Sequence, residues 1–257
     1  LKIYTTIDSR MQLHAEEAVS AHMANLQQEF FIQAKNNKNA PFVNISTAET
    51  NRILNRAMKS SNRWNVLKSL DKTEEEIIKS FSVKTKMTVF TWKGEKDTIM
   101  TPIDSIRYYK HFLQSGLMAM EPQTGNIKAW VGGINYKYFQ YDHVGQGARQ
   151  VGSTFKPFVY ATAIEQLNMS TCDSIIDAPF TMPAGRHHAT EDWSPRNSNN
   201  KYIGMVTLKK ALANSINTIS AKLMDKVGPE AVVKLTHKLG VKSEIPTQAS
   251  IALGAVD

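Results

Sequence analysis

Apolar residues recur at the three- and four-residue spacing of a helix in several stretches of the chain. In the first stretch, residues 9–30, one face carries Met11, Ala15, Ala18, Val19, Met23 and Leu26. Asp8 or Ser9 is placed to cap this helix, because a short polar side chain accepts hydrogen bonds from the first free N–H groups. The same spacing predicts further helices at about 47–80, from Ser153 onward, at about 207–227 and at 229–239.

Alternation of apolar and polar residues predicts strands elsewhere. Such alternation is found at residues 2–7, 82–91 and 97–101, the last two joined by a turn at 93–96. Residues 115–121 and 126–133 predict a hairpin, because Pro122 and Gly125 frame the turn between two apolar arms. Helices and strands together predict a mixed α/β (α+β) fold.

The polar residues at 36–41 predict a loop, which we take as a boundary between two parts of the chain. We therefore predict three parts. Residues 1–35 form a linking strand and the first helix, 36–113 an insertion or small lobe, and 114–257 the core.

Composition narrows the function classes. The net charge is +8, but the basic residues are scattered and form no Arg-rich block, so nucleic acid is not an expected partner. One cysteine, Cys172, excludes an internal disulfide and a Cys-rich zinc site, and His14 and His22 lack ligand partners, so no metal or cofactor is expected. No apolar run reaches eighteen residues. The chain lacks an initiator Met and is read as a piece of a longer protein.

Candidate chemistry begins with Ser153-Thr154-Phe155-Lys156, a Ser-x-x-Lys motif. Residues three apart share a helix face, so the Lys156 amine can reach back to the Ser153 hydroxyl. A serine hydroxyl needs a base to become a nucleophile, and a lysine serves only when its pKa is lowered. Neighbouring aromatic residues such as Phe155 supply an apolar setting for that, and Gly152 permits a tight entry to the helix.

The same spacing also occurs at Ser69 with Lys72 and at Ser198 with Lys201. Charged residues surround the first pair, which is therefore expected to be exposed with Lys72 protonated. Asn residues surround the second pair and indicate a loop, in which Lys201 need not share a face with Ser198. Downstream, Ser215-Ile216-Asn217 is a Ser-x-Asn motif with apolar flanks. The alternative reading for Ser215 is a polar residue that bonds its own backbone.

These motifs and their surroundings resemble the transpeptidase region of class A, bifunctional penicillin-binding proteins. The resemblance runs through Thr5-Thr6-Ile7-Asp8, Ala119-Met120-Glu121-Pro122-Gln123-Thr124-Gly125, Ala129-Trp130-Val131-Gly132-Gly133, Arg149-Gln150-Val151-Gly152-Ser153-Thr154-Phe155-Lys156-Pro157, Gly204-Met205-Val206-Thr207-Leu208 and Ala213-Asn214-Ser215-Ile216-Asn217. It implies a penicillin-binding-protein/serine β-lactamase-like fold, an antiparallel sheet flanked by helices, with 114–257 as the first part of the transpeptidase core.

The resemblance also implies a D,D-transpeptidase that cross-links peptidoglycan stem peptides in cell-wall synthesis. Ser153 would attack the D-Ala-D-Ala amide, with Lys156 as base. Ser215 would relay a proton to the leaving amine, and Asn217 would hydrogen-bond Lys156 and the substrate. β-Lactams would acylate Ser153. An N-terminal glycosyltransferase domain and a membrane anchor would lie outside this chain, on the extracytoplasmic face of a bacterial membrane.

One departure from the family pattern matters. The chain has no Lys-Thr-Gly or Lys-Ser-Gly, and Lys242-Ser243-Glu244 is the nearest sequence. We therefore expect the fold to be incomplete on its C-terminal side and the chain alone to be inactive or weakly active. Two alternatives stay open: a D,D-carboxypeptidase or β-lactamase relative, and a non-catalytic scaffold that keeps the fold.

Overall fold

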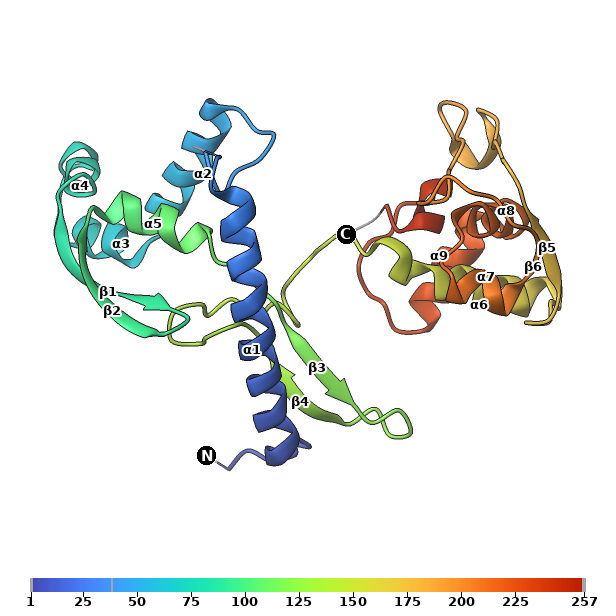
Figure 1. The fold of residues 1–257 in the computed structure, drawn as a ribbon, viewed down its shortest axis with the longest axis horizontal. Helices are drawn as coiled ribbons and strands as arrows, with labels where there is room; N and C mark the ends of the chain where they lie inside the picture. The colour runs from blue at the N-terminus through green and yellow to red at the C-terminus, as the bar shows by residue number, and fades with distance from the viewer. Residues whose placement is uncertain (1, 38, 256–257) are drawn as a thin grey trace. The chain divides into compact units, whose positions relative to one another are not determined.

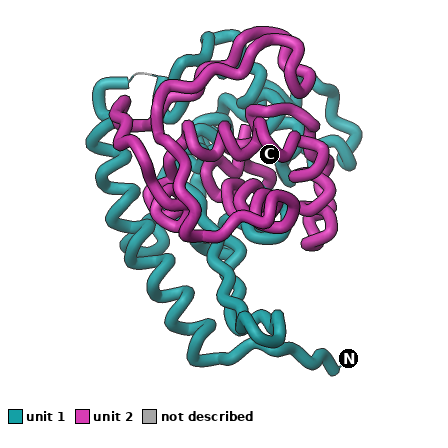
Figure 2. Tube along the Cα trace, turned by 90° about the vertical axis from the view of Figure 1, so that its right-hand side faces the viewer, with its two compact units in different colours: residues 1–147 teal, residues 148–257 magenta. Residues whose placement is uncertain are grey.

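A computed structural model of the chain describes residues 2–37 and 39–255. The chain divides into two compact units, residues 1–147 and 148–257, which Figures 1 and 2 distinguish. The described strands pair two by two, β1 with β2, β3 with β4 and β5 with β6, and each pair is antiparallel. Helices and antiparallel strand pairs confirm the predicted α+β class. None of the described helices has the length and apolar character of a bilayer-spanning helix.

The first unit is organised around α1 (Ser9–Ala34). Asp8 caps it, as predicted, by accepting hydrogen bonds from the backbone N–H groups of Arg10 and Met11. Its buried positions recur every four residues: Ala15, Val19 and Met23 belong to the same apolar cluster as Ala129 and Val131 of β4, and the Gln27 amide bonds the backbone at His111 and Leu113. Burial of this stripe, rather than helix propensity, is the main source of stability for such a helix.

The strand predicted at residues 2–7 is wrong. These residues make no ladder; Thr6 and Asp8 each make one hydrogen bond to a carbonyl of β4, at Ile127 and Lys128. The hairpin prediction is confirmed with shorter arms, β3 (Leu117–Met120) and β4 (Ile127–Val131).

The stretch predicted as helical at 47–80 folds as three helices: α2 (Thr47–Lys59), α3 (Asn62–Ser69) and α4 (Glu74–Ser80). Hydroxyl side chains of Ser46, Ser61 and Thr73 cap the three starts, so the polar residues that interrupt the apolar pattern are the breaks. Strands β1 (Thr85–Thr91) and β2 (Gly94–Met100) form the predicted second hairpin, and α5 (Pro102–Lys110) follows.

In the second unit, α6 (Lys156–Leu167) packs against α8 (Asn217–Val227) and α9 (Pro229–Lys238). Fully buried Val159 and Ala163 belong to the same apolar cluster as Ile219 and Leu223. The strands β5 (Ser174–Asp177) and β6 (Gly204–Thr207) and the short helix α7 (Leu208–Ala213) complete this unit. Short 3-10 turns lie at Gly152–Phe155, Arg186–His188 and Ala249–Leu253.

The continuous helix predicted at 207–227 is wrong, because the chain breaks between α7 and α8. The Ile216 N–H bonds the Ala211 carbonyl and the Ser215 N–H bonds the Leu212 carbonyl, each at 3.0 Å. This is the Schellman ending of a helix, which requires a left-handed residue at its turn. That residue is Ser215, with φ of +53°, where glycine is the usual choice.

Candidate active site

Lys156 is the first residue of α6, and its side chain is buried with 1 % of its surface exposed. Its Nζ donates to the Ser215 carbonyl oxygen at 2.7 Å, the Ser215 Oγ at 3.0 Å and the Asn217 Oδ1 at 2.6 Å. An ammonium has three N–H donors, so these contacts satisfy it completely. The structure therefore brings together Lys156 and the Ser-x-Asn motif, the arrangement that the resemblance implies.

Burial controls the proton affinity of this lysine. Desolvation lowers the pKa of Lys156 from 10.5 to about 8, because an apolar environment disfavours the charged form. Phe155 and Tyr160, both buried, are part of that environment. At neutral pH roughly one-tenth of the molecules then hold a neutral amine able to accept a proton.

Ser153 lies in the 3-10 turn just before α6 and is exposed. Gly152 precedes it with φ of +55°, which agrees with the predicted tight entry. The hydrogen bond expected from Lys156 to the Ser153 hydroxyl is not formed among the described residues, because the Nζ donates to Ser215, in the turn between α7 and α8, and to Asn217 at the start of α8. The candidate nucleophile is thus exposed, while its candidate base is held by Ser215 and Asn217.

A glycine that the sequence reasoning missed supports this turn. The Gly152 N–H donates to the Gly254 carbonyl oxygen at 3.1 Å. A Cβ added at Gly254 would lie 1.9 Å from the Gly152 carbonyl oxygen, so only glycine allows the two backbones to approach this closely. A lone glycine in a sequence carries no signal of such an approach.

The two rival motifs behave as expected. The Ser69 hydroxyl donates to the Val66 carbonyl, and exposed Lys72 pairs with Glu76. Ser198 and Lys201 are both exposed in a loop. Neither pair offers a buried lysine.

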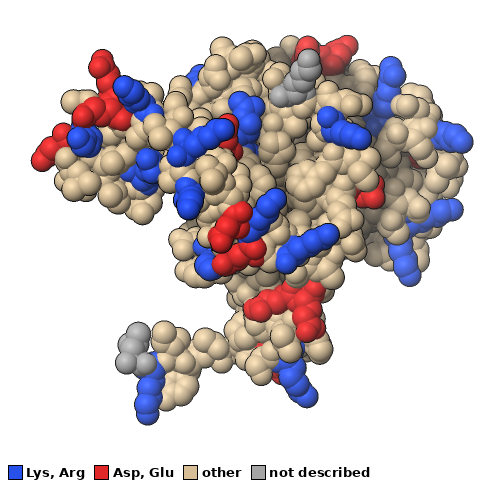
Figure 3. Space-filling model, turned by 60° about the vertical axis from the view of Figure 1, so that its left-hand side comes forward, with Lys and Arg blue, Asp and Glu red and all other residues tan. Residues whose placement is uncertain are grey.

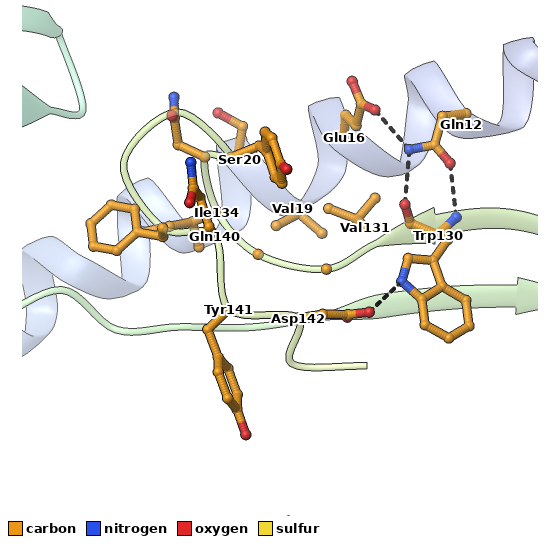
Figure 4. Close-up of a pocket in the computed structure, with 15 residues that line it drawn as sticks. Gln12, Glu16, Val19, Ser20, Trp130, Val131, Ile134, Gln140, Tyr141 and Asp142 are labelled. Atoms are coloured by element: carbon orange, nitrogen blue, oxygen red, sulfur yellow. Dashed lines mark hydrogen bonds between the residues drawn. The ribbon is translucent and has the colours of Figure 1, made fainter. Parts of the chain in front are cut away.

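The first unit contains a hollow of about 550 Å³ between α1 and the segment after β4 (Figure 4). The Gln12 amide bonds both the N–H and the carbonyl of Trp130, and the Trp130 indole N–H donates to Asp142. The hydrogen-bonding groups of these side chains are therefore paired with one another, and the Gln12 amide connects α1 to the edge of β4 that does not pair with β3. The hollow has no buried nucleophile–base pair and is read as structural.

Charged and metal-ligating side chains are the other groups from which a site could be built. On the face drawn in Figure 3, Lys and Arg are interspersed with Asp and Glu. Within the described ranges, no three His, Cys, Asp or Glu side chains gather closely enough to hold a metal ion.

Comparison with known proteins agrees with this geometry. Residues 115–251 match the family model of the penicillin binding protein transpeptidase domain, and residues 37–113 match that of the penicillin-binding protein middle domain. Penicillin-binding protein 1A of Neisseria flavescens is 35% identical over 169 residues, which cover 65% of this chain and 20% of that protein. Penicillin-binding protein 1A of Aquifex aeolicus (strain VF5) is 41% identical over 148 residues, 56% of this chain and 19% of that protein.

The fold is similar to that in the crystal structure of penicillin-binding protein 1A from Haemophilus influenzae. The TM-score is 0.61 at 20% sequence identity, and the match covers 99% of this chain and 40% of that chain. The expected fold family is therefore confirmed. The chain spans about a fifth of the length of the two relatives described above.

Proposed function

Because the chain belongs to the penicillin-binding protein transpeptidase family, we propose that it carries the serine acyl-transfer site of a peptidoglycan D,D-transpeptidase. The observation that carries the proposal is the buried Lys156, held by Ser215 and Asn217 beside the exposed Ser153. Lysine is rarely buried without a carboxylate partner, and a lowered pKa is what a lysine base requires.

The proposed reaction has two steps. The Ser153 Oγ attacks the carbonyl carbon of the penultimate D-Ala, an ester forms, and the amide bond to the terminal D-Ala breaks. The Ser153 proton passes to Lys156 and, through the Ser215 hydroxyl, to the leaving amine. An amine on a neighbouring stem peptide then attacks the ester, which restores Ser153. The Ser153 backbone N–H is proposed to stabilise the oxyanion.

A β-lactam would acylate Ser153 by the same route, because its strained amide takes the place of the D-Ala-D-Ala bond. We place the whole protein at the extracytoplasmic face of a bacterial membrane, with a glycosyltransferase domain and an anchor outside these 257 residues. The division at 1–35, 36–113 and 114–257 stays a proposal, supported by the match of the middle-domain family model to residues 37–113.

Labelling with a fluorescent penicillin tests this function in the full-length protein. Wild type should take the label, Ser153→Ala should not, and Ser69→Ala, the matched control with the same motif spacing, should label like wild type. An unlabelled wild type would favour the scaffold alternative, and rapid hydrolysis of the label would favour a β-lactamase relative. The 257-residue chain, which contains no Lys-Thr-Gly, should label slowly or not at all.

A further inference from the structure

A buried polar cluster at the start of α8 joins one residue of this helix to two residues that are distant from it in sequence. Asp177 ends β5 and has 2 % of its surface exposed, Asn197 lies in the following loop with 8 % exposed, and Thr218 in α8 is fully buried. Buried polar groups are costly unless each is hydrogen-bonded, so a cluster of this kind has a defined arrangement.

Asn197 supplies the cap that α8 lacks. The residue at the cap position is Ile216, whose side chain cannot accept a hydrogen bond. The Asn197 Oδ1 instead accepts from the backbone N–H of Asn217 at 3.0 Å and of Thr218 at 3.3 Å. A residue twenty positions upstream of Asn217 thus satisfies the first N–H groups of the helix.

Asp177 fixes which way the Asn197 amide points. Its Oδ1 accepts from the Asn197 Nδ2 at 2.9 Å and from the Thr218 Oγ1 at 2.5 Å, and its Oδ2 accepts from the Ile203 N–H at 3.0 Å. Burial raises the pKa of Asp177, but these hydrogen bonds outweigh it and the net shift is downward. A carboxylate only accepts, so the Asn197 nitrogen faces Asp177 and its oxygen faces α8.

The neighbouring backbone fixes the Asn217 side chain in the same way. The Arg196 carbonyl accepts from the Asn217 Nδ2 at 2.8 Å, which leaves the Asn217 Oδ1 facing Lys156. The segment Arg196–Asn197 therefore holds both the backbone and the amide of Asn217. Each hydrogen bond in this series has a defined donor and acceptor, so the order of dependence can be tested.

We propose that Asn197, oriented by Asp177, is a positioning residue that acts through Asn217 to hold the lysine base. The inference rests on the proposed function, because it assigns Asn197 to the same site. Asn197 does not touch the reacting atoms in this arrangement. Its effect on the reaction passes through the placement of one acceptor oxygen.

The test measures the second-order rate of acylation by a fluorescent penicillin across pH in the full-length protein. The variants are Asn197→Ala, Asn217→Ala and the double variant. Asn199→Ala is the matched control, because Asn199 lies in the same loop and its side chain also accepts from a backbone N–H, that of Lys201 rather than one of α8. Asp177→Asn is a second perturbation that keeps the shape of the side chain and removes its obligatory acceptor.

Asn197→Ala should slow acylation about 100-fold, as misplacement of a catalytic group by about 1 Å does, and Asn199→Ala should not. The double variant should be no slower than Asn217→Ala, because both changes break one chain of contacts. The acid limb of the pH profile should move to lower pH in Asn197→Ala, since the Lys156 ammonium loses an acceptor. Asp177→Asn should likewise slow acylation and move the acid limb of the pH profile to lower pH.

Three results would overturn the inference: additive losses in the double variant, an Asn197→Ala rate equal to that of Asn199→Ala, or an acid limb shifted to higher pH. The last result would mean that the loosened fold merely lets water reach Lys156. Labelling of Ser153→Ala separates the two proposals. If Ser153→Ala is acylated, the proposed function fails; if it is not and Asn197→Ala behaves as wild type, only the positioning role fails.

Discussion

Replacing Lys156 by methionine removes a buried charge without a large change in shape, and the structure gives the size of the effect. The pKa of Lys156 falls from 10.5 to about 8 on burial. At 1.36 kcal/mol for each pH unit, the protonated lysine makes the folded state about 3 kcal/mol less stable than it would be with an unperturbed ammonium. Methionine has no such cost, but it leaves the acceptors on Ser215 and Asn217 unsatisfied, at roughly 1–3 kcal/mol each.

These two terms oppose each other at neutral pH, so the informative quantity is the change with pH. Below about pH 8 the lysine is protonated in both the folded and unfolded states, and the cost is constant. Between about pH 8 and 10.5 the unfolded state keeps the proton and the folded state loses it, so the free energy of unfolding rises with pH. The wild type should gain about 3 kcal/mol relative to Lys156→Met between pH 7 and 10.5.

Urea unfolding followed by circular dichroism at several pH values measures this difference. Tyrosine titration affects both proteins and cancels in the comparison; Tyr160, whose pKa burial raises to about 12, lies outside the range. A difference that stays constant from pH 7 to 10.5 would show that Lys156 is hydrated in solution. A difference of the opposite sign would show that an unrecognised anion stabilises its charge.

Three further predictions follow from the same geometry. Acylation of the full-length protein should be about 50-fold faster at pH 8 than at pH 6, because the neutral fraction of Lys156 rises from about 1 % to about half; a flat profile would exclude it as the base. Ser215→Gly should be up to about 1 kcal/mol more stable than Ser215→Ala in thermal unfolding, because φ is +53°, and both should acylate poorly. Gly254→Ala should lose more than about 2 kcal/mol through its clash with the Gly152 carbonyl, whereas Gly185→Ala, also at positive φ but with open space around it, should lose less.

The sequence was most informative where the physical signal is local. The face of α1 follows from the spacing of its apolar residues, and Asp8 precedes it as a cap. The charged neighbours of Ser69 and Lys72 predict that this pair is exposed, whereas Ser153 opens an apolar helix. The structure shows that Lys72 is exposed. Local periodicity and local charge decide each of these points without any tertiary contact.

Other features depend on contacts that no local pattern encodes. The break at Ser215 is a helix ending in which serine takes the place of the usual glycine, so the apolar spacing on both sides reads as one helix. The cap on α8 comes from Asn197, whose position relative to Asn217 is set by the fold of the intervening strand and loop. The apolar alternation at residues 2–7 failed as a strand because this segment reaches β4 only through isolated hydrogen bonds from the Thr6 hydroxyl and the Asp8 N–H, which do not make a ladder.

The strained turn at Ser215 has a chemical use in the proposed reaction. It directs both the carbonyl oxygen and the hydroxyl of this residue at the Lys156 Nζ, and the Asn217 amide oxygen is the third acceptor. The carbonyl and amide oxygens only accept hydrogen bonds, whereas a hydroxyl both donates and accepts. When Lys156 is neutral, its two N–H groups stay on the fixed acceptors and its lone pair faces the Ser215 Oγ. The Lys156–Ser215 hydroxyl contact is then the one bond of the three that reverses direction, which makes it the path by which a proton taken up by Lys156 leaves again.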